Sequence, residues 1–449
     1  MNLYIRCDMQ VVEKNIIKIH VKKVSIMTSL EHLARSISRV SAPLLDRILK
    51  SLSSSKRINS SLKKLETKRL RKIDEPKRVL IIPDINIGDA IITQSFISPL
   101  KKFFPSLEIS YVYQRKAYPL IKANPDISRH FPLFRSFGYP SKRDCKTLKN
   151  LIKRYDFNLI FNFCPYLSFR NFKSANSSVI YPIRFIANVI RAYDSNNHKA
   201  QIVFQMNRYA KELIEEFPSD TKSRDKLKLD FSGNNLYTTR QLYTKTNKIM
   251  EKLRIDPHAK KILFNPDTAS PYTLIPLKFQ VQLLKGLLAS QNLILLLSCG
   301  YIFKGIEKKL LQEIPFHQRK KIIVIPRDIP IDVYAAIIDN SHMFITGDTG
   351  PLHIAAAKKV IVNSNNYFRN STALVGIFGA TSAKIYGYDS FSDEYLSASQ
   401  NAPSKIFEGF PSCKNLTCID KIFKKCPKVR CFEGVNTEEV IEYIQNYLS

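Results

Sequence analysis

The sequence predicts an α/β protein with two doubly wound domains, each built on a parallel sheet. Short apolar runs alternate with amphipathic stretches of helical length from about residue 77, and this alternation restarts near residue 260. Strands that alternate with helices form parallel sheets that are covered on both faces. The length of 449 residues, 44% of them hydrophobic, is sufficient for two cores.

The first domain is predicted over residues 76–250. Residues 79–82 form an apolar run, "DINIGD" follows as a loop, and a helix and a second strand occupy "AIITQSFISPLKKFFPSLEISYVYQ". The segment "LKNLIKRYDFNLIFNF" repeats the order helix then strand. We expect residues 236–258 to be a helix that leads to the domain boundary.

The second domain is predicted over residues 259–435, followed by a C-terminal helix over residues 436–449. Its strand and helix segments alternate as "KKILFNP", "PLKFQVQLLKGLLAS", "NLILLLS", "GIEKKLLQEI", "KKIIVIP", "IDVYAAIID", "HMFITG", "PLHIAAA" and "ALVGIFG". In an open parallel sheet, ligands bind beyond the carboxyl ends of the strands, so the site is expected in the loops there.

Residues 1–75 are predicted to be a basic, partly helical extension, with Met27 as an alternative start to Met1. An apolar stripe lies at helical spacing and comprises Leu30, Leu33, Ile37, Val40, Leu44 and Ile48. Cations surround this stripe at Arg35, Arg39, Arg47 and Lys50. Such a helix can lie on an anionic membrane surface or pack on the neighbouring domain, and the sequence leaves both open.

The charge balance predicts an anionic partner. The chain has 70 Lys and Arg against 38 Asp and Glu, a formal net charge of +32. The basic run "KRINSSLKKLETKRLRK" contains no aromatic residue for base stacking, so nucleic acid is not the expected partner. There is no uninterrupted apolar run of about 18 residues and no secretory signal pattern, so we expect a cytoplasmic protein.

Four cysteines near the C-terminus form the one metal-site candidate. They are Cys413, Cys418, Cys426 and Cys431. Their spacing is looser than that of common structural zinc sites, so a structural metal and a local packing cluster both stay open.

The stretch "ITGDTGPLHIAAA", residues 345–357, is the first candidate site. It joins a predicted strand to a predicted helix, which places Asp348, Thr349 and Gly350 at the strand's carboxyl end. Backbone N–H groups at a helix start lack intrahelical acceptors, and the helix dipole favours an anion there. Gly350 permits close approach of a diphosphate, and Thr349 and His353 offer side-chain donors. The alternative is an ordinary capped helix.

The stretch "NIGDA" is the second candidate site. Gly88 opens the first helix of the first domain, and Asp89 lies in its first turn. An aspartate at this position is often a helix cap. A carboxylate that faces a bound diphosphate can instead deprotonate an acceptor hydroxyl while a nucleotide diphosphate departs.

Together these stretches resemble glycosyltransferase family 9, the heptosyltransferases of lipopolysaccharide core assembly. The resemblance rests on "RVLIIPDINIGDAIITQSFISPLKKFFP", on "FITGDTGPLHIAAA…VGIFGAT" and on "CPKVRC…VNTEEVIEYI". It implies a GT-B architecture, in which two Rossmann-like domains face a central cleft. It also implies inverting transfer of a heptose from ADP-heptose without a required metal or other cofactor.

By position, the resemblance makes Asp89 the general base. Thr349, Gly350 and His353 would hold the donor's diphosphate, and Asp348 would support that loop or the sugar.

One loop departs from the family pattern. Thr273 stands where the family has a cation, and Ile275 replaces an aromatic residue. Lys278, just beyond, is the expected substitute for donor binding. Arg369, in an insert before "VGIFGAT", is a further candidate cation.

The acceptor side is assigned to the first domain at Gly88, Arg115 and Lys116. Further loop cations there are Lys142, Arg143, Arg170 and Lys173, although for any one of them solvated surface charge is the preferred interpretation. The expected acceptor is an acidic glycolipid, the lipopolysaccharide core, at the inner face of a bacterial inner membrane, where the enzyme would be peripheral. Protein O-heptosyltransfer and a catalytically silent nucleotide- or lipid-binding relative stay open, whereas a dehydrogenase is disfavoured because no G-x-G-x-x-G follows the first strand.

Overall fold

The computed structural model describes two separate α/β units and their connections. The residues it describes are 63, 66, 67, 70, 73, 76–84, 86–134, 140–164, 167, 178–180, 185, 201–217, 235–268, 271, 273–289, 293–364, 368–369, 372–379, 381–388, 404–409 and 431–449. The predicted amphipathic helix near residues 28–50 lies outside them. So do Arg170, Lys173 and three of the four C-terminal cysteines, Cys413, Cys418 and Cys426.

The first unit is a five-stranded parallel sheet in the order β3-β2-β1-β4-β5. Its strands are β1 (Arg78–Ile82), β2 (Glu108–Gln114), β3 (Arg129–Phe134), β4 (Leu159–Asn162) and β5 (Ser178–Ile180). Its helices are α5 (Ile87–Phe103), η1 (Arg115–Ala117), α6 (Tyr118–Ile121), α7 (Lys142–Tyr155) and α9 (Ile202–Ile214). The side chains of β4 are buried throughout, as the continuous apolar run predicts for a strand covered on both faces.

The second unit is a six-stranded parallel sheet in the order β14-β13-β10-β7-β8-β9. Its strands are β7 (Lys260–Asn265), β8 (Leu293–Ser298), β9 (Ile322–Ile325), β10 (Met343–Thr346), β13 (Ala373–Phe378) and β14 (Ser404–Glu408). Its helices are α11 (Leu277–Leu288), α12 (Ile306–Glu313), α13 (Phe316–Arg319), α14 (Ile331–Asp339), α15 (Gly350–Ala356), α16 (Ala383–Tyr386) and α18 (Thr437–Leu448). Within the described part of the chain, no helix combines the length and apolar character needed to cross a bilayer.

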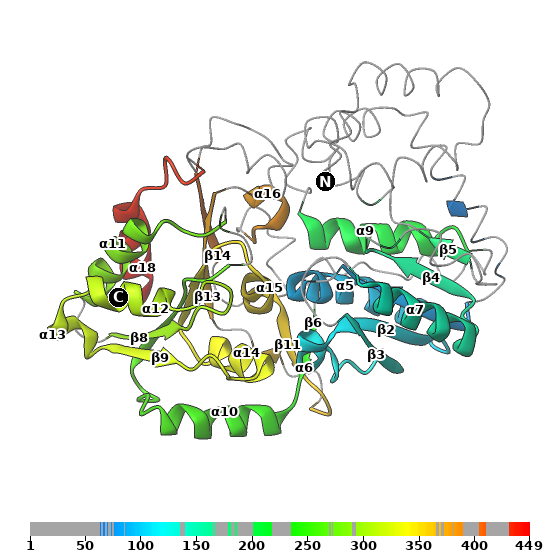
Figure 1. Ribbon diagram of the computed structural model, residues 1–449, viewed down its shortest axis with the longest axis horizontal. Helices are drawn as coiled ribbons and strands as arrows, with labels where there is room; N and C mark the ends of the chain where they lie inside the picture. The colour runs from blue at the N-terminus through cyan, green and yellow to red at the C-terminus, as the bar shows by residue number, and fades with distance from the viewer. Residues whose placement is uncertain are drawn as a thin grey trace, which may run out of the picture.

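Both sheets have the strand order of a Rossmann fold. Counted within its own unit, the second sheet runs 3-2-1-4-5-6 and the first runs 3-2-1-4-5. The order reverses between β1 and β4 in one sheet and between β7 and β10 in the other, and ligands of such sheets bind beyond the strand ends at that reversal. Figure 1 shows the two sheets side by side, with α5 and α15 facing each other where the units meet.

A small third sheet connects the two units, and it corrects the expected helix over 236–258. Strand β6 (Asn235–Thr238) pairs in parallel with β11 (Lys358–Ile361), which also pairs with β12 (Phe368–Arg369). Helix α10 (Arg240–Lys252) follows and packs on α14 of the second unit. Strand β6 also contacts α5 and α6 of the first unit, so the connecting segment contacts both units.

The end of the predicted extension packs on the first unit. Leu70 is fully buried in the core that α5 and α9 share. The Thr67 hydroxyl donates to the Glu216 carboxylate at 2.7 Å, and the Tyr209 hydroxyl donates to Glu66 at 3.3 Å. Glu66, Thr67 and Leu70 thus belong to the folded domain, because their apolar and polar contacts lie on α9 and its C-terminal end.

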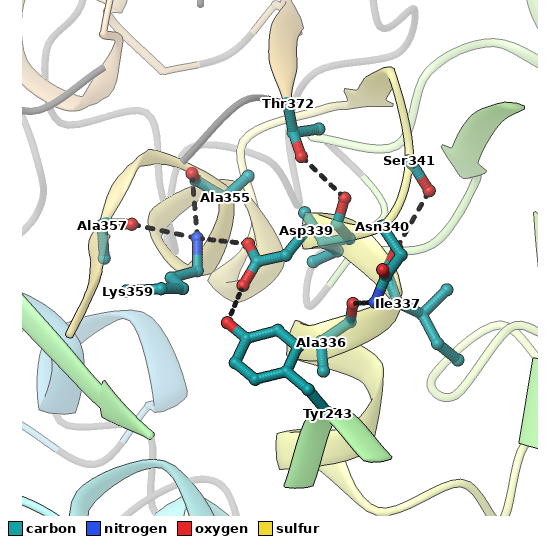
Figure 2. A network of polar contacts seen from close by, with 11 residues as sticks. Tyr243, Ala336, Ile337, Asp339, Asn340, Ser341, Ala355, Ala357, Lys359 and Thr372 are labelled. Atoms are coloured by element: carbon teal, nitrogen blue, oxygen red, sulfur yellow. Dashed lines mark hydrogen bonds and ion pairs between the residues drawn. The ribbon is translucent and has the colours of Figure 1, made fainter. Parts of the chain in front are cut away.

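A buried ion pair fixes α14 to β11 and α10 (Figure 2). The Lys359 ammonium lies 3.0 Å from the Asp339 carboxylate, with both side chains buried. The ammonium also donates to the carbonyls of Ala355 and Ala357, and the Tyr243 hydroxyl donates to Asp339 at 2.6 Å. Each charge therefore has several partners, which is the condition under which a buried ion pair is tolerated.

Replacing Asp339 with alanine is expected to lower the free energy of unfolding by about 3–5 kcal/mol, because the Lys359 charge would stay buried without its counter-charge. Urea denaturation followed by circular dichroism measures this loss. The matched control is Arg208→Ala, which breaks a partly exposed pair with Glu212 on α9 and should cost less than about 1 kcal/mol. The double variant Asp339→Leu/Lys359→Met should be more stable than Asp339→Ala; equal or lower stability would rule out the unpaired charge as the cause.

Candidate functional site

The two candidate stretches from the sequence meet in space at two glycines. Helix α5 begins with "IGD" after β1, and α15 begins with Gly350 after β10. A Cβ atom added at Gly88 would lie 2.6 Å from Cδ2 of His353 and 3.5 Å from the Cα of Gly350. A Cβ atom added at Gly350 would lie 3.3 Å from the Cβ atom of Ile87. The backbones of the two helix starts are therefore in contact, and larger residues do not fit between them.

Neither helix start is capped by a side chain in the described structure. The Asn86 amide donates instead to the Asp89 carboxylate at 3.0 Å. The Thr349 hydroxyl lies 3.4 Å from that of Thr346, and it accepts a long bond from Asn265. The N-cap side chains of both helices thus accept no first-turn N–H bond, and the positive ends of two helix dipoles converge on one place.

A cavity of about 490 Å³ lies beside this meeting point. Its first-domain wall comprises Asn86, Ile87, Gly88, Lys116 and Pro119. Its second-domain wall comprises Asn265, Asp267, Thr268, Ser298, Cys299, Tyr301, Ile302, Ile325, Pro326, Arg327, Asp328, Ile329, Pro330, Ile331, Tyr334, Thr349, Gly350 and Pro351. The cavity therefore lies between the two units, along the carboxyl ends of β7 to β10.

Polar residues at the end of β7 form part of the second-domain wall. The Asn265 amide donates to the Thr346 hydroxyl at 2.9 Å, which ties β7 to β10. The Asp267 carboxylate accepts N–H bonds from residues 301, 302 and 303 and so holds the loop after β8. Sequence analysis did not single out Asn265 or Asp267, although "NPD" directly after an apolar run is a signal that could have found them.

The departure at Thr273 has a clear structural counterpart. The Thr273 and Thr268 hydroxyls are 2.5 Å apart, and Thr268 donates to the Asp348 carbonyl at 3.4 Å. Two neutral hydroxyls therefore stabilise the loop around Asp348. Lys278 is exposed at the start of α11 and is not among the residues that line the cavity. Arg369 lies in β12, opposite Lys359 in the register.

Asp89 and Asp348 lie close enough for their charges to interact. Burial raises the pKa of Asp348 from 3.8 to about 6, and the neighbouring Asp89 carboxylate adds to that shift. Burial also raises the pKa of Asp89, while hydrogen bonds from Asn86 oppose the rise. The phenol of Tyr386 has its pKa raised by burial and by Asp348, Asp89 and Asp84. Asp84 and Tyr386 are thus two further members of this acidic group that sequence analysis did not find.

His353 is buried and neutral at pH 7. Its Nδ1 lies 2.8 Å from the Tyr388 hydroxyl, and burial lowers its pKa from 6.5 to about 4. The ring packs against Gly88, and it is not among the cavity-lining residues. The structure therefore places His353 in the contact between the two helices, where it holds no positive charge.

The predicted acceptor-side cations lie in different places. Arg115 is exposed, while Lys116 reaches the cavity and lies over the Tyr301 ring of the second unit, 4.0 Å from its centroid. The last candidate metal ligand, Cys431, is buried. Among the described residues, no group of three or more His, Cys, Asp or Glu is arranged to hold a metal ion.

Replacing Asp348 with asparagine is expected to stabilise the protein at pH 8 by up to about 3 kcal/mol, since a carboxyl whose pKa is raised by folding loses stability as the pH rises through the folded value. The gain should vanish below pH 4, where the carboxyl is protonated in both states. Thermal unfolding from pH 3.5 to 8 measures it, with Glu313→Gln at the exposed end of α12 as control. A gain that does not depend on pH would contradict the assignment of burial as the cause.

The fold is similar to that of solved glycosyltransferases. A scan against protein-family models gives no match for the chain, and a search of curated protein sequences gives none either. A glycosyl transferase family 9 structure from Veillonella parvula is 16% identical with a TM-score of 0.58, over 83% of this chain and 97% of that chain. The ADP-heptose lps heptosyltransferase II of E. coli is 13% identical with a TM-score of 0.51, over 83% and 98%. The chain therefore has the two-domain GT-B fold of these glycosyltransferases.

Proposed function

We propose that the protein is an inverting glycosyltransferase that uses a nucleotide diphosphate sugar. The observation that carries this proposal is the meeting of two uncapped helix starts, at Gly88 and Gly350, beside a cavity of about 490 Å³ and next to the Asp89 carboxylate. Such a place combines an anion site, a chamber for an organic group and a base. Each of these three parts has a role in sugar transfer from a nucleotide.

The cavity has the size and character of a nucleoside site. Its volume lies within the range of small-molecule pockets, and aliphatic and aromatic side chains such as Ile302, Ile325 and Tyr334 form its walls. The diphosphate would lie at the starts of α5 and α15, where N–H groups and helix dipoles stabilise negative charge. This stabilisation supports departure of the diphosphate without a metal ion, so we propose no cofactor.

Asp89 is proposed as the general base. Its carboxylate would take the proton from an acceptor hydroxyl while that oxygen forms a bond to the anomeric carbon. The bond between the anomeric carbon and the diphosphate oxygen breaks, and its electron pair leaves with the nucleotide diphosphate. A raised pKa suits this role, because a carboxylate with a higher pKa is a stronger base.

The finer assignment is ADP-heptose as donor and an acidic glycolipid as acceptor. It rests on the sequence resemblance and on the printed description of the E. coli structure as an ADP-heptose lps heptosyltransferase. The net charge of +32 supports an anionic acceptor and a peripheral position on the inner face of a bacterial inner membrane. Arg115, Lys142 and Arg143 are exposed on the first domain, where such an acceptor would bind.

The first test is calorimetric binding of ADP-heptose, ADP and GDP-mannose. We expect ADP-heptose to bind, and we expect Ile329→Trp to weaken binding at least tenfold, because the larger side chain occupies the cavity. Leu277→Trp places the same side chain on an exposed position of the second domain and should bind like the wild type. If the wild-type protein binds none of the three nucleotides, the proposed donor site is wrong, and a catalytically silent protein becomes the favoured interpretation.

The second test concerns the base. Asp89→Asn should retain ADP-heptose binding and reduce sugar transfer by about 10²–10⁴-fold, because an asparagine amide cannot take the proton from the acceptor hydroxyl. Transfer by the wild type should fall as the pH drops through the raised pKa of Asp89. Asp348→Asn should move this acidic limb to lower pH, because a neighbouring negative charge is removed. Radiolabelled sugar transfer to a lipopolysaccharide core acceptor measures both, and unchanged transfer by Asp89→Asn would eliminate it as the base.

A further inference from the structure

The described side chains that line the cavity carry little positive charge compared with the negative charge of the proposed ligand. A nucleotide diphosphate brings several negative charges, and the cavity wall also carries the carboxylates of Asp267 and Asp328. Among the described lining residues, the cationic side chains are Lys116 and Arg327. Thr273, which stands where the family has a cation, is neutral, and Lys278, the expected substitute, is not among the lining residues.

Arg327 is engaged inside its own domain. Its guanidinium lies 3.9 Å from the Glu307 carboxylate, which in turn accepts the N–H of Gly300 at 3.1 Å. The Gly300 bond holds the loop after β8 to the start of α12, and the Arg327 contact joins the segment after β9 to the same carboxylate. The Asp267 carboxylate is likewise saturated, since it accepts three backbone N–H groups of the same loop. The carboxylates of Glu307 and Asp267 therefore stabilise the conformation of the loop after β8.

Lys116 comes from the opposite domain. It lies in η1 at the carboxyl end of β2, and η1 also contacts α5, whose start lines the same cavity. Its ammonium lies over the ring of Tyr301, 4.0 Å from the centroid, so the contact crosses from the first unit to the second. Tyr301 is about half exposed, on the loop that Asp267 holds. A cation–π contact at an exposed site is weak, so it can position a flexible lysine and still let it move.

We propose that Lys116 is the side chain of the first domain that neutralises the diphosphate of a donor bound in the second domain, and that Tyr301 positions it for this contact. Donor binding then draws the two domains together, because the ligand and its counter-charge lie on opposite sides of the cavity. This inference rests on the proposed function. Burial lowers the pKa of Lys116 in the protein without ligand, so a bound diphosphate would also favour its charged form.

The test compares ADP with adenosine by calorimetry, using the wild type, Lys116→Met and Lys102→Met. Methionine keeps the apolar stem and removes the charge, and Lys102 is an exposed lysine near the far end of α5. Lys116→Met should weaken ADP binding by about 10- to 100-fold and leave adenosine binding unchanged, since only ADP carries the charges that an ammonium contacts. Lys102→Met should bind both ligands like the wild type.

Tyr301→Leu tests the positioning role. It should weaken ADP binding several-fold, and Lys116→Met/Tyr301→Leu should bind ADP no more weakly than Lys116→Met, because both changes act through one ammonium. Additive losses in the double variant would overturn the role of Tyr301. Thermal unfolding of each variant confirms that the fold is retained.

Three results separate this inference from the proposed function. If the wild type binds ADP and Lys116→Met binds it equally well, Lys116 is not the counter-charge, while the donor site stands. If Lys116→Met loses adenosine as much as ADP, the residue shapes the cavity and the inference fails. If the wild type binds neither ligand, the proposed function fails and the inference fails with it.

Discussion

The close approach of two helix starts is the constraint on which the rest of this structure depends. Gly88 and Gly350 permit it, because a side chain at either position would meet the opposite backbone, Ile87 or the His353 ring. The contact lies where the strand order reverses in both sheets. Each Rossmann-like unit thus directs the positive start of one helix at the other unit, and both helix starts line the ligand cavity.

The electrostatics of the site are divided between two sides of this contact. N–H groups of two helix starts and the Lys116 ammonium supply positive charge on the cavity side. Asp89 and Asp348 interact as neighbouring carboxyls, and burial raises the pKa of both. His353, packed against Gly88 and hydrogen-bonded to Tyr388, stays neutral because burial disfavours its charged form.

Structural connections beside the cavity stabilise the domain arrangement. The small sheet of β6 and β11, the packing of α10 on α14, and the buried pair of Lys359 and Asp339 join the chain segment between the domains to the second domain. Lys122 of the first domain also pairs with Asp332 of α14, at 3.1 Å. These contacts join the first domain to the second.

The sequence by itself determined the architecture and the two motifs at its centre. Alternating apolar runs and amphipathic stretches give parallel strands because burial on both faces requires them, and "NIGDA" and "GDTGPLH" mark strand-to-helix junctions through local chemistry. Only the tertiary structure placed Lys116 over Tyr301, grouped Asp84 and Tyr386 with Asp89, and left Lys278 outside the cavity. It also assigned β6 to a strand pair with β11 more than a hundred residues away. Periodicity reports which face of an element is buried, whereas these contacts depend on how two separately folded units pack together, and no local pattern encodes that packing.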